Sequence, residues 1–531
     1  MAIIIQNIAV PYGTEHGEII SRALKKANIP FSSALRTGIH KISLDARKQN
    51  DIKAVASVWT ELESIDEEKR LCKRMDFCSL VDITPFTPSP TGTEPMNGRI
   101  AIAGFGPAGM FAALVLAEAG YRPLVLERGA DADSRAAAVE NFWKNRRFSA
   151  NTNVQFGEGG AGTFSDGKLT TRIKDPLCRY VSARLAECGA PDEILTAAKP
   201  HLGTDRLREI VKNIRRRIEA AGGEVRFNSC VTDISVKNGS ISSVTVNNAE
   251  EIPVSALITA VGHSARDTFE MLSRKDIALV PKPFAIGARI EHSQESVNRS
   301  LYGTRADDPT LPIGEYQLSY TAGGRGVYTF CMCPGGTVVP SQSEENTVVT
   351  NGMSEFARNG SNANAALVVT VSPDDYGSGI LDGVDFIRRI EQNAFKAAGS
   401  DYSAPACTVG AFLDKKASLS GASVSPTYAC GVAAASLDSI LPPYVTEMMR
   451  TGINVFSRRM KCFGDKGAIL TAPETRTSSP VRIPRGDDMC SISCKGIYPC
   501  GEGAGYAGGI MSAAVDGVKQ ACAVMNVYKS E

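Results

Sequence analysis

The stretch that decides the fold covers residues 100–129 and reads IAIAGFGPAGMFAALVLAEAGYRPLVLERG. A short apolar strand is followed by a glycine turn, an apolar helix and a second apolar strand that ends at Glu127. Gly104, Gly106 and Gly109 fit the pattern G-x-G-x-x-G, which is informative here because it lies between a strand and a helix. This order predicts a βαβ unit that binds a dinucleotide.

The residues of this unit have separate roles at a pyrophosphate. The first glycine allows the tight turn, the second lets the backbone approach phosphate, and the third lets helix and strand pack closely. Pro107 suits a first helical turn, where unpaired N–H groups favour an anion. Glu127 lies 23 residues after Gly104 and is placed to accept hydrogen bonds from ribose hydroxyls. The predicted contacts are Gly104, Gly106, Pro107, Ala108, Gly109, Glu127 and Arg128.

The size and charge of the chain exclude some classes of protein. Its 531 residues suffice for two or three domains, because single cores stop growing at roughly 250 to 300 residues. Its 58 Lys and Arg nearly balance its 57 Asp and Glu, so nucleic acid or an anionic membrane is not the expected partner. The 14 cysteines are scattered along the chain rather than spaced as a disulfide framework, and the start MAIIIQNIAV lacks the features of a secretory leader. No apolar run reaches the ~18 residues that a membrane span needs. We therefore expect a cytoplasmic protein without a membrane span, and its oligomeric state stays open.

Changes of composition along the chain predict its domains. Residues 1–83 indicate a small N-terminal α/β module, and residues 84–98, which contain four prolines, indicate a linker. Residues 99–280 and 466–531 indicate two parts of one Rossmann-type domain. Residues 281–465 contain alternating segments rich in Gly and Thr, which predict a mainly β cap or substrate domain. The expected fold class is α/β.

A second glycine segment follows the last predicted strand. From Ile497 an apolar strand leads into Gly501 and Glu502, and further glycines precede a helix of small residues. This arrangement resembles the C-terminal flavin motif of FAD proteins, in which a strand-end acid binds ribityl hydroxyls and the next helix N-terminus faces the pyrimidine edge of the flavin. The resemblance implies that the Rossmann-type domain binds FAD through Gly501, Glu502, Gly508, Gly509 and Ile510.

A third glycine segment, VQFGEGGAGTFSDGKL at residues 154–169, is either a flexible surface loop or a cofactor loop. Its position after the βαβ unit resembles the loop that covers the flavin ring in fumarate-reductase-like and geranylgeranyl-reductase-like flavoproteins. The resemblance implies contacts at Gly159, Gly160, Ser165 and Lys168. Two weaker predictions are Val231, with backbone groups for adenine, and Gly262, which alternatively is only the end of a strand.

Residues 99–531 resemble a bacterial group described as FAD-dependent, NAD(FAD)-utilising dehydrogenases. The resemblance is carried by the segments QFGEGGAGTFSDGKL, TFCMCPGGTVV, ETRTSSPVRI and GEGAGYAGGIMSA, and the N-terminal segment SLDARKQNDI also resembles that group. It implies the fold and the cofactor FAD but leaves the substrate open.

The sequence does not identify a catalytic residue. Three residues are weak candidates: Tyr506, Arg476 and Lys168. An aromatic residue at position 506 is equally typical of a packing role, and Arg476 either binds an anionic group or pairs with a nearby acid. Cys331 and Cys333 form a C-x-C pattern that we interpret as structural, and His292 is expected to be a surface or hydrogen-bonded histidine. The spacing of His and Cys predicts no metal site.

These observations favour an FAD-dependent oxidoreductase, either a dehydrogenase or a reductase. It would transfer a hydride between the flavin and a small or moderately apolar substrate held between the FAD-binding domain and the cap. We find no second βαβ unit that opens on a G-x-G-x-x-G turn, so NAD(P)H is expected only as a transient electron donor, with ferredoxin and the substrate as alternatives. The alternative functions are a polyprenyl double-bond reductase, a flavin-dependent RNA modifier and a scaffold with structural FAD.

Overall fold

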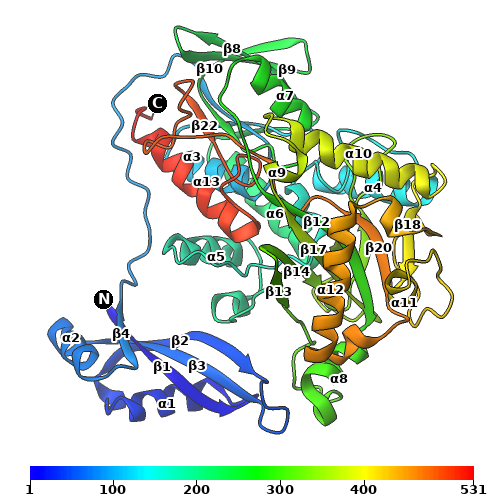
Figure 1. Ribbon diagram of the computed structural model, residues 1–531. Helices are drawn as coiled ribbons and strands as arrows, with labels where there is room; N and C mark the ends of the chain where they lie inside the picture. The colour runs from blue at the N-terminus through cyan, green and yellow to red at the C-terminus, as the bar shows by residue number, and fades with distance from the viewer. Residues whose placement is uncertain (531) are drawn as a thin grey trace.

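The computed structural model of the chain describes residues 1–530. Figure 1 shows a small N-terminal module, an extended connection that follows β4, and a larger body formed by the rest of the chain. Among residues 1–530, every helix is too short or too polar to cross a membrane.

The N-terminal module is a four-stranded antiparallel sheet with two helices. Its strands lie in the order β2-β3-β1-β4, which is the order of the ferredoxin-like βαββαβ motif. Its elements are β1 (Ala2–Pro11), α1 (His16–Lys26), β2 (Ala34–Asp45), β3 (Lys53–Leu62), α2 (Ile65–Arg74) and β4 (Cys78–Val81). The backbone of Ile42 in β2 exchanges hydrogen bonds with Thr196 and Ala198, so the module is attached to the larger body.

A parallel sheet with the strand order β7-β6-β5-β10-β22 lies at the centre of the larger body. The strand β22 comes from near the C-terminus and pairs with β10, which also pairs with β5 of the predicted βαβ unit. Two further strands, β9 and β8, extend the sheet in antiparallel pairing. The strands are β5 (Arg99–Ala103), β6 (Leu124–Leu126), β7 (Glu224–Arg226), β8 (Val231–Lys237), β9 (Ser240–Val246), β10 (Glu250–Thr259) and β22 (Ile497–Pro499). Residues 224–234 contribute to both β7 and β8, because the chain bends between the two strands.

Two apolar helices, α3 and α13, pack closely against each other beside this sheet (Figure 1). Residues 108–117 of α3 are all buried, as their composition predicts. At Gly517 of α13 a side chain would clash with the carbonyl oxygen of Ala108, so this glycine permits the close packing. The helices of this part are α3 (Pro107–Glu118), α4 (Ala132–Asn145), α5 (Leu177–Glu187), α6 (Gly203–Ala220), α7 (Arg266–Arg274) and α13 (Ile510–Met525).

A second seven-stranded sheet forms the cap, in the order β13-β14-β17-β12-β20-β18-β19. Its strands are β12 (Phe284–Ser293), β13 (Ser319–Ala322), β14 (Arg325–Cys333), β17 (Asn362–Val371), β18 (Ala404–Thr408), β19 (Val432–Ala434) and β20 (Ile469–Glu474). The strand β20 lies within this sheet, whereas the sequence places residues from 466 onward in the Rossmann-type domain. The difference arises because β20 pairs with β12 and β18, which a local pattern cannot show.

The cap is less purely β than the sequence predicts. It contains α8 (Gln294–Tyr302), α9 (Pro373–Tyr376), α10 (Asp382–Ala397), α11 (Val409–Leu413) and α12 (Pro443–Arg459). In α10 the residues Val384, Ile387, Ile390 and Ala394 recur at helical spacing and are buried, a pattern that the Gly- and Thr-rich segments around it obscure. Two short pairs of strands complete the fold, β11 (Val280–Pro281) with β21 (Val481–Arg482) and β15 (Thr337–Pro340) with β16 (Thr350–Met353).

The two faces of the cap sheet differ in polarity. Ile286, Ala288 and Ile290 of β12 belong to the apolar core that includes buried residues of α12. The alternate residues Arg289 and Glu291 are also buried but are charged. The cap sheet therefore carries a buried layer of ionic groups on the face opposite its apolar core.

Candidate functional site

The turn after β5 has the close backbone contacts that the glycine pattern predicts. Gly104 has φ +98°, and a Cβ there would lie 2.5 Å from the carbonyl oxygen of Ala260. A Cβ at Gly109 would clash with the carbonyl oxygen of Gly104. Gly106 is the N-cap residue of α3, and Pro107 is its first residue. The N-terminus of α3 is thus held beside the end of β10 by contacts that only glycine permits.

The loop of residues 154–169 packs against this turn. The N–H of Gly159 donates to the carbonyl oxygen of Phe105 at 2.9 Å. Gly160 has φ +62°, and a Cβ there would lie 2.9 Å from Cα of Gly106. A Cβ at Gly162 would lie 3.2 Å from Cγ1 of Ile510, the first residue of α13. The structure therefore brings all three glycine segments of the sequence together.

The fully buried guanidinium of Arg135 holds the first part of this loop. It donates to the carbonyl oxygens of Asn153 at 2.9 Å, Val154 at 2.9 Å and Glu158 at 2.7 Å, and to that of Gly157. Burial lowers the pKa of Arg135 to about 10, so it stays protonated at neutral pH. The sequence reasoning missed this residue because a single arginine in a helix has no distinguishing pattern.

Glu127 joins three backbone segments at the end of β6. Its carboxylate is only 4% exposed and accepts hydrogen bonds from the N–H groups of Phe105 at 2.8 Å, Gly129 at 2.9 Å and Gly157 at 2.9 Å. A carboxylate has about four acceptor positions, so these three donors leave about one position open. The neighbouring Arg128 is engaged in an ion pair with Asp267, at 3.0 Å between Nη1 and Oδ1.

The C-terminal glycine segment leaves the N-terminus of α13 open. Gly501 lies against α3, where a Cβ would be 2.8 Å from Cβ of Ala108, and its N–H donates to Asp516 at 2.7 Å. By contrast, Gly508 and Gly509 are exposed, and a Cβ at either position would have no atom within 4 Å. Gly509 is the N-cap residue of α13, so the first N–H groups of this helix face open space beside Gly162.

Glu502 is a carboxyl group without a hydrogen-bond partner. Its side chain is partly buried and forms no hydrogen bond with any residue between 1 and 530. Burial raises the pKa of Glu502 to about 7, while the charge of Lys282 opposes this rise and Cys331 adds to it. An acid that is partly withdrawn from water and lacks donors fits the hydroxyl groups of a ribityl chain.

The three remaining predicted contacts differ in their surroundings. Gly262 touches the C-terminal segment, since a Cβ at Gly503 would lie 2.5 Å from its carbonyl oxygen. Val231 is buried at the start of β8. Ser165 is used within its own loop, because its hydroxyl donates to the carbonyl of Gly162 at 2.6 Å and accepts from the N–H of Gly167 at 3.0 Å.

The three weak catalytic candidates all have protein partners. Tyr506 packs against the guanidinium groups of Arg482 and Arg485, which are 5.1 Å and 3.7 Å from its ring centroid. Arg476 is buried and forms the intramolecular pair that the sequence left as an alternative, with 2.8 Å and 3.1 Å to the two oxygens of Glu391. Arg476 is therefore engaged within the protein, and the hydroxyl of Tyr506 accepts a hydrogen bond from the N–H of Arg485 at 3.2 Å.

Lys168 connects the glycine loop to the cap. Its ammonium lies 2.7 Å from Glu315 and 3.4 Å from Asp166, and these charges raise the pKa of Lys168. Asp166 is fully buried and also pairs with Arg358 of the cap.

His292 differs from its prediction as a surface or hydrogen-bonded residue. It is 1% exposed and packs against the rings of Tyr316 and Phe463, and neither of its ring nitrogens has a hydrogen-bond partner among the described residues. Burial lowers the pKa of His292 to about 4, so it is neutral. In residues 1–530 no group of three or more His, Cys, Asp or Glu side chains could hold a metal ion.

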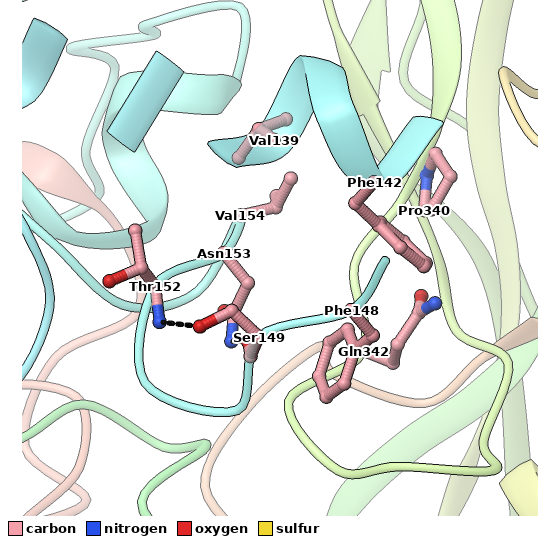
Figure 2. A pocket seen from close by; sticks show the side chains of 9 residues that line it. All are labelled: Val139, Phe142, Phe148, Ser149, Thr152, Asn153, Val154, Pro340 and Gln342. Atoms are coloured by element: carbon pink, nitrogen blue, oxygen red, sulfur yellow. Dashed lines mark hydrogen bonds between the residues drawn. The ribbon is translucent and has the colours of Figure 1, made fainter. Parts of the chain in front are cut away.

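A small hollow lies beside the glycine loop but outside the three glycine segments. Figure 2 shows it between α4 and residues 148–154, where the N–H of Thr152 donates to the hydroxyl of Ser149. The hollow is only about as large as one water molecule, with a volume of about 10 Å³, and is lined by Val139, Phe142, Phe148, Ser149, Thr152, Asn153, Val154, Pro340 and Gln342. We place the candidate site at the three glycine segments instead, because backbone N–H groups and an unpaired acid converge there.

A family model matches part of the chain, and one relative matches almost all of it. Residues 283–477 match the family described as FAD-dependent protein, C-terminal domain-like. An uncharacterised protein of Clostridium beijerinckii is 48% identical over 526 residues, which are 98% of this chain and 98% of that protein.

Solved structures resemble the chain more distantly. A geranylgeranyl bacteriochlorophyll reductase-like protein of Thermoplasma acidophilum is 11% identical, with coverage of 81% of this chain and 78% of that chain and a TM-score of 0.35. The halogenase PltM in complex with phloroglucinol and FAD is 12% identical, with coverage of 81% and 68% and a TM-score of 0.36. Similarity at this level does not indicate which reaction the chain performs.

Proposed function

The chain belongs to the same family as the Clostridium beijerinckii protein and contains the domain described for FAD-dependent proteins, and from this premise we propose that it is an FAD-dependent oxidoreductase. The proposed reaction is hydride transfer between the flavin and a small or moderately apolar substrate. NAD(P)H is proposed as a transient electron donor.

The observation that carries this proposal is the convergence of the three glycine segments. The N-termini of α3 and α13 lie beside the same loop, with Gly160 against Gly106 and Gly162 against Ile510. The strand order β7-β6-β5-β10-β22 around them is that of a Rossmann-type dinucleotide-binding sheet, which supports the proposed two-part FAD-binding domain.

Each segment has a proposed role toward FAD. The pyrophosphate would bind at the N-terminus of α3, where Gly106 keeps the backbone accessible. The free acceptor position of Glu127 would take a hydroxyl of the adenosine ribose, and Glu502 would accept hydrogen bonds from the ribityl chain. The open N–H groups at the start of α13 would face the pyrimidine edge of the flavin.

Bound FAD would supply the two-electron chemistry of its isoalloxazine ring. The chain's own residues position the substrate and limit the access of water. The cap sheet provides a buried ionic layer around Arg289, whose guanidinium forms two hydrogen bonds to Glu474, at 2.7 Å and 3.0 Å. Lys168 keeps a proton on Nζ beside Glu315, and its position on the glycine loop makes it a candidate to orient a polar substrate group.

The charges of the N-terminal module do not favour an RNA-binding function. Arg36 pairs with Glu61 at 2.6 Å, and Arg47 pairs with Asp45 at 2.6 Å. Basic side chains that are paired with carboxylates attract phosphates more weakly than an unpaired basic patch does.

The experiment that tests the proposal is a titration of the purified chain with FAD, in which the change of flavin fluorescence measures binding. The substitution Gly106→Ala is informative because a Cβ there would be 3.7 Å from Cα of Gly160, an ordinary contact that does not disturb the FAD-free chain. The added methyl would exclude the pyrophosphate, so affinity should fall by a factor of ten or more, roughly 1.4 kcal/mol. Gly17→Ala, at an open position in α1, is the matched control and should bind FAD normally. A wild-type chain that does not bind FAD, or a Gly106→Ala chain that binds it unchanged, would contradict the proposal.

A further inference from the structure

The strand β14 contains a bulge at Cys331. Phe330 pairs with Ala366 and Cys333 pairs with Asn364, so β14 has one residue more than its partner over this interval. Cys331 itself has φ +41°, a left-handed conformation that such a bulge usually reserves for glycine. A side chain held in this conformation costs of order 1 kcal/mol, and such strain is concentrated at functional sites.

The bulge places the thiol of Cys333 against the backbone of Cys331. This thiol donates a hydrogen bond to the carbonyl oxygen of Cys331, with 3.4 Å between Sγ and the oxygen. Nη1 of Arg289 donates to the same carbonyl oxygen at 2.8 Å. A Cβ at Gly352 would lie 3.0 Å from Sγ of Cys333 and would clash with the Arg289 guanidinium, so this glycine leaves space for both groups.

The two thiols differ in access and in charge. Cys333 is fully buried, whereas Cys331 is partly exposed. The neighbouring thiol of Cys333 and the charges of Arg289 and Lys168 lower the pKa of Cys331, against the effects of burial and of Glu474. The pKa of Cys333 is raised, first by its hydrogen bond to Cys331. Cys331 is therefore the reactive member, and Cys333 is the protonated partner behind it.

The position of Cys331 relates this pair to the proposed flavin site. A Cβ at Gly336 would lie 3.0 Å from Cβ of Cys333 and 3.0 Å from Cβ of Ser354, and the hydroxyl of Ser354 donates to Asp166 of the glycine loop. The pair thus lies where the cap meets the glycine loop, and the effect of Cys331 on the pKa of Glu502 agrees with this position.

We propose that Cys331 and Cys333 are a redox-active thiol pair that exchanges two electrons with the flavin, an inference that rests on the proposed function. In the oxidative direction the Cys331 thiolate and the Cys333 thiol form one S–S bond, and Cys333 loses its proton. The two electrons, the proton from Cys333 and one proton from water pass to oxidised FAD, which becomes the reduced dihydroflavin. The reverse step opens the disulfide and restores the oxidised flavin.

The first test does not depend on flavin. The purified chain is alkylated with iodoacetamide near neutral pH before and after treatment with the thiol oxidant diamide, and its peptides are mapped by mass spectrometry. Cys331 should be labelled first, because the pKa values of the other cysteines are raised, for example to about 12 for Cys407 and to about 11 for Cys430. Diamide should abolish this label and produce a peptide with a bond between Cys331 and Cys333.

Two variants serve as controls. Cys331→Gly suits the left-handed backbone at this position, so it should fold at least as stably as the wild type while it lacks the reactive thiol. Cys333→Ser keeps a hydroxyl that can donate to Cys331, so Cys331 should still be labelled, but diamide should produce no internal disulfide.

The second test counts electrons in the FAD-loaded protein. After diamide treatment and anaerobic titration with dithionite, the wild type should take up about four electrons per flavin and both variants about two, because the disulfide accepts one further pair. A wild type that takes up only about two, or that yields no bond between Cys331 and Cys333, would overturn the thiol pair. A chain that forms this disulfide but binds no FAD would instead refute the proposed function and the electron exchange with flavin.

Discussion

Substitution of Glu502 by Gln tests the proposed cofactor site through its dependence on pH. In the FAD-free chain, burial raises the pKa of Glu502 to about 7, and its carboxyl has no hydrogen-bond partner among residues 1–530. Ribityl hydroxyls that donate to this carboxyl would stabilise its charged form, so FAD binding should lower the pKa and release a proton. The affinity of the wild-type chain for FAD should therefore rise with pH.

The size of this effect follows from the pKa. If FAD binds only the charged carboxylate, the dissociation constant at about pH 6 should exceed that at about pH 8 by roughly tenfold, or about 1.4 kcal/mol. The Gln variant has no charge to lose, so its dissociation constant should be the same at both pH values. At about pH 8 it should bind FAD about tenfold more weakly than the wild type, since a hydrogen bond to a charged group contributes about 1.5–3 kcal/mol.

The assay is quenching of flavin fluorescence at constant ionic strength across this pH range. His263 does not interfere, because burial lowers its pKa to about 3 and it stays neutral throughout. Equal wild-type affinities at the two pH values, or the same pH dependence in the Glu502→Gln variant, would refute the assignment of Glu502 to the ribityl chain.

Three further outcomes are expected. Arg135→Met removes a donor from four carbonyl groups of the glycine loop, and those of Asn153 and Val154 then have no other donor among the described residues. Thermal unfolding should therefore show a loss of about 3–5 kcal/mol and FAD binding should weaken, and unchanged stability would contradict this role. Gly517→Ala forces a clash with the carbonyl oxygen of Ala108 and should lower the melting temperature, whereas Gly17→Ala should be neutral or stabilising by about 0.5–1 kcal/mol. Equal effects of the two substitutions would contradict the close packing of α13 against α3. The pKa of Glu502 is raised in the folded FAD-free chain, so the wild-type protein should lose stability as pH rises from about 4.5 to about 7. In denaturant unfolding, Glu502→Gln should therefore be more stable than the wild type by up to about 3 kcal/mol at about pH 8 and equally stable near pH 4. A difference in stability that does not change across this pH range would contradict the raised pKa.

The parts of the fold that sequence reasoning reached are local ones. The turn at Gly104, the helix that begins at Pro107 and the helix that begins at Ile510 each depend on neighbouring residues. The three glycine segments were recognised from their composition and from resemblance, although nothing in the sequence measures the distance between them. Boundaries were less accurate, because β20 contains residues assigned in advance to another domain and α10 lies within a region expected to be mainly β.

The candidate site shows why the rest was out of reach. Arg476 had two interpretations, and only its contact with Glu391 on α10 decides between them. Glu127 has the expected position, but three backbone N–H groups already occupy most of its carboxylate. Such partners lie up to tens of residues apart in the chain, so neither periodicity nor spacing identifies them.

The sequence by itself determined where the backbone turns tightly and which helices are apolar, because these properties follow from the backbone freedom of glycine and from the pattern of apolar side chains. Only the tertiary structure decided that the ends of β5 and β22 lie beside one loop, that Arg135 holds that loop and that Cys331 is strained next to Cys333. The physical reason is that burial, charge and hydrogen bonding act between groups that are close in space, and long-range pairing of strands brings those groups together.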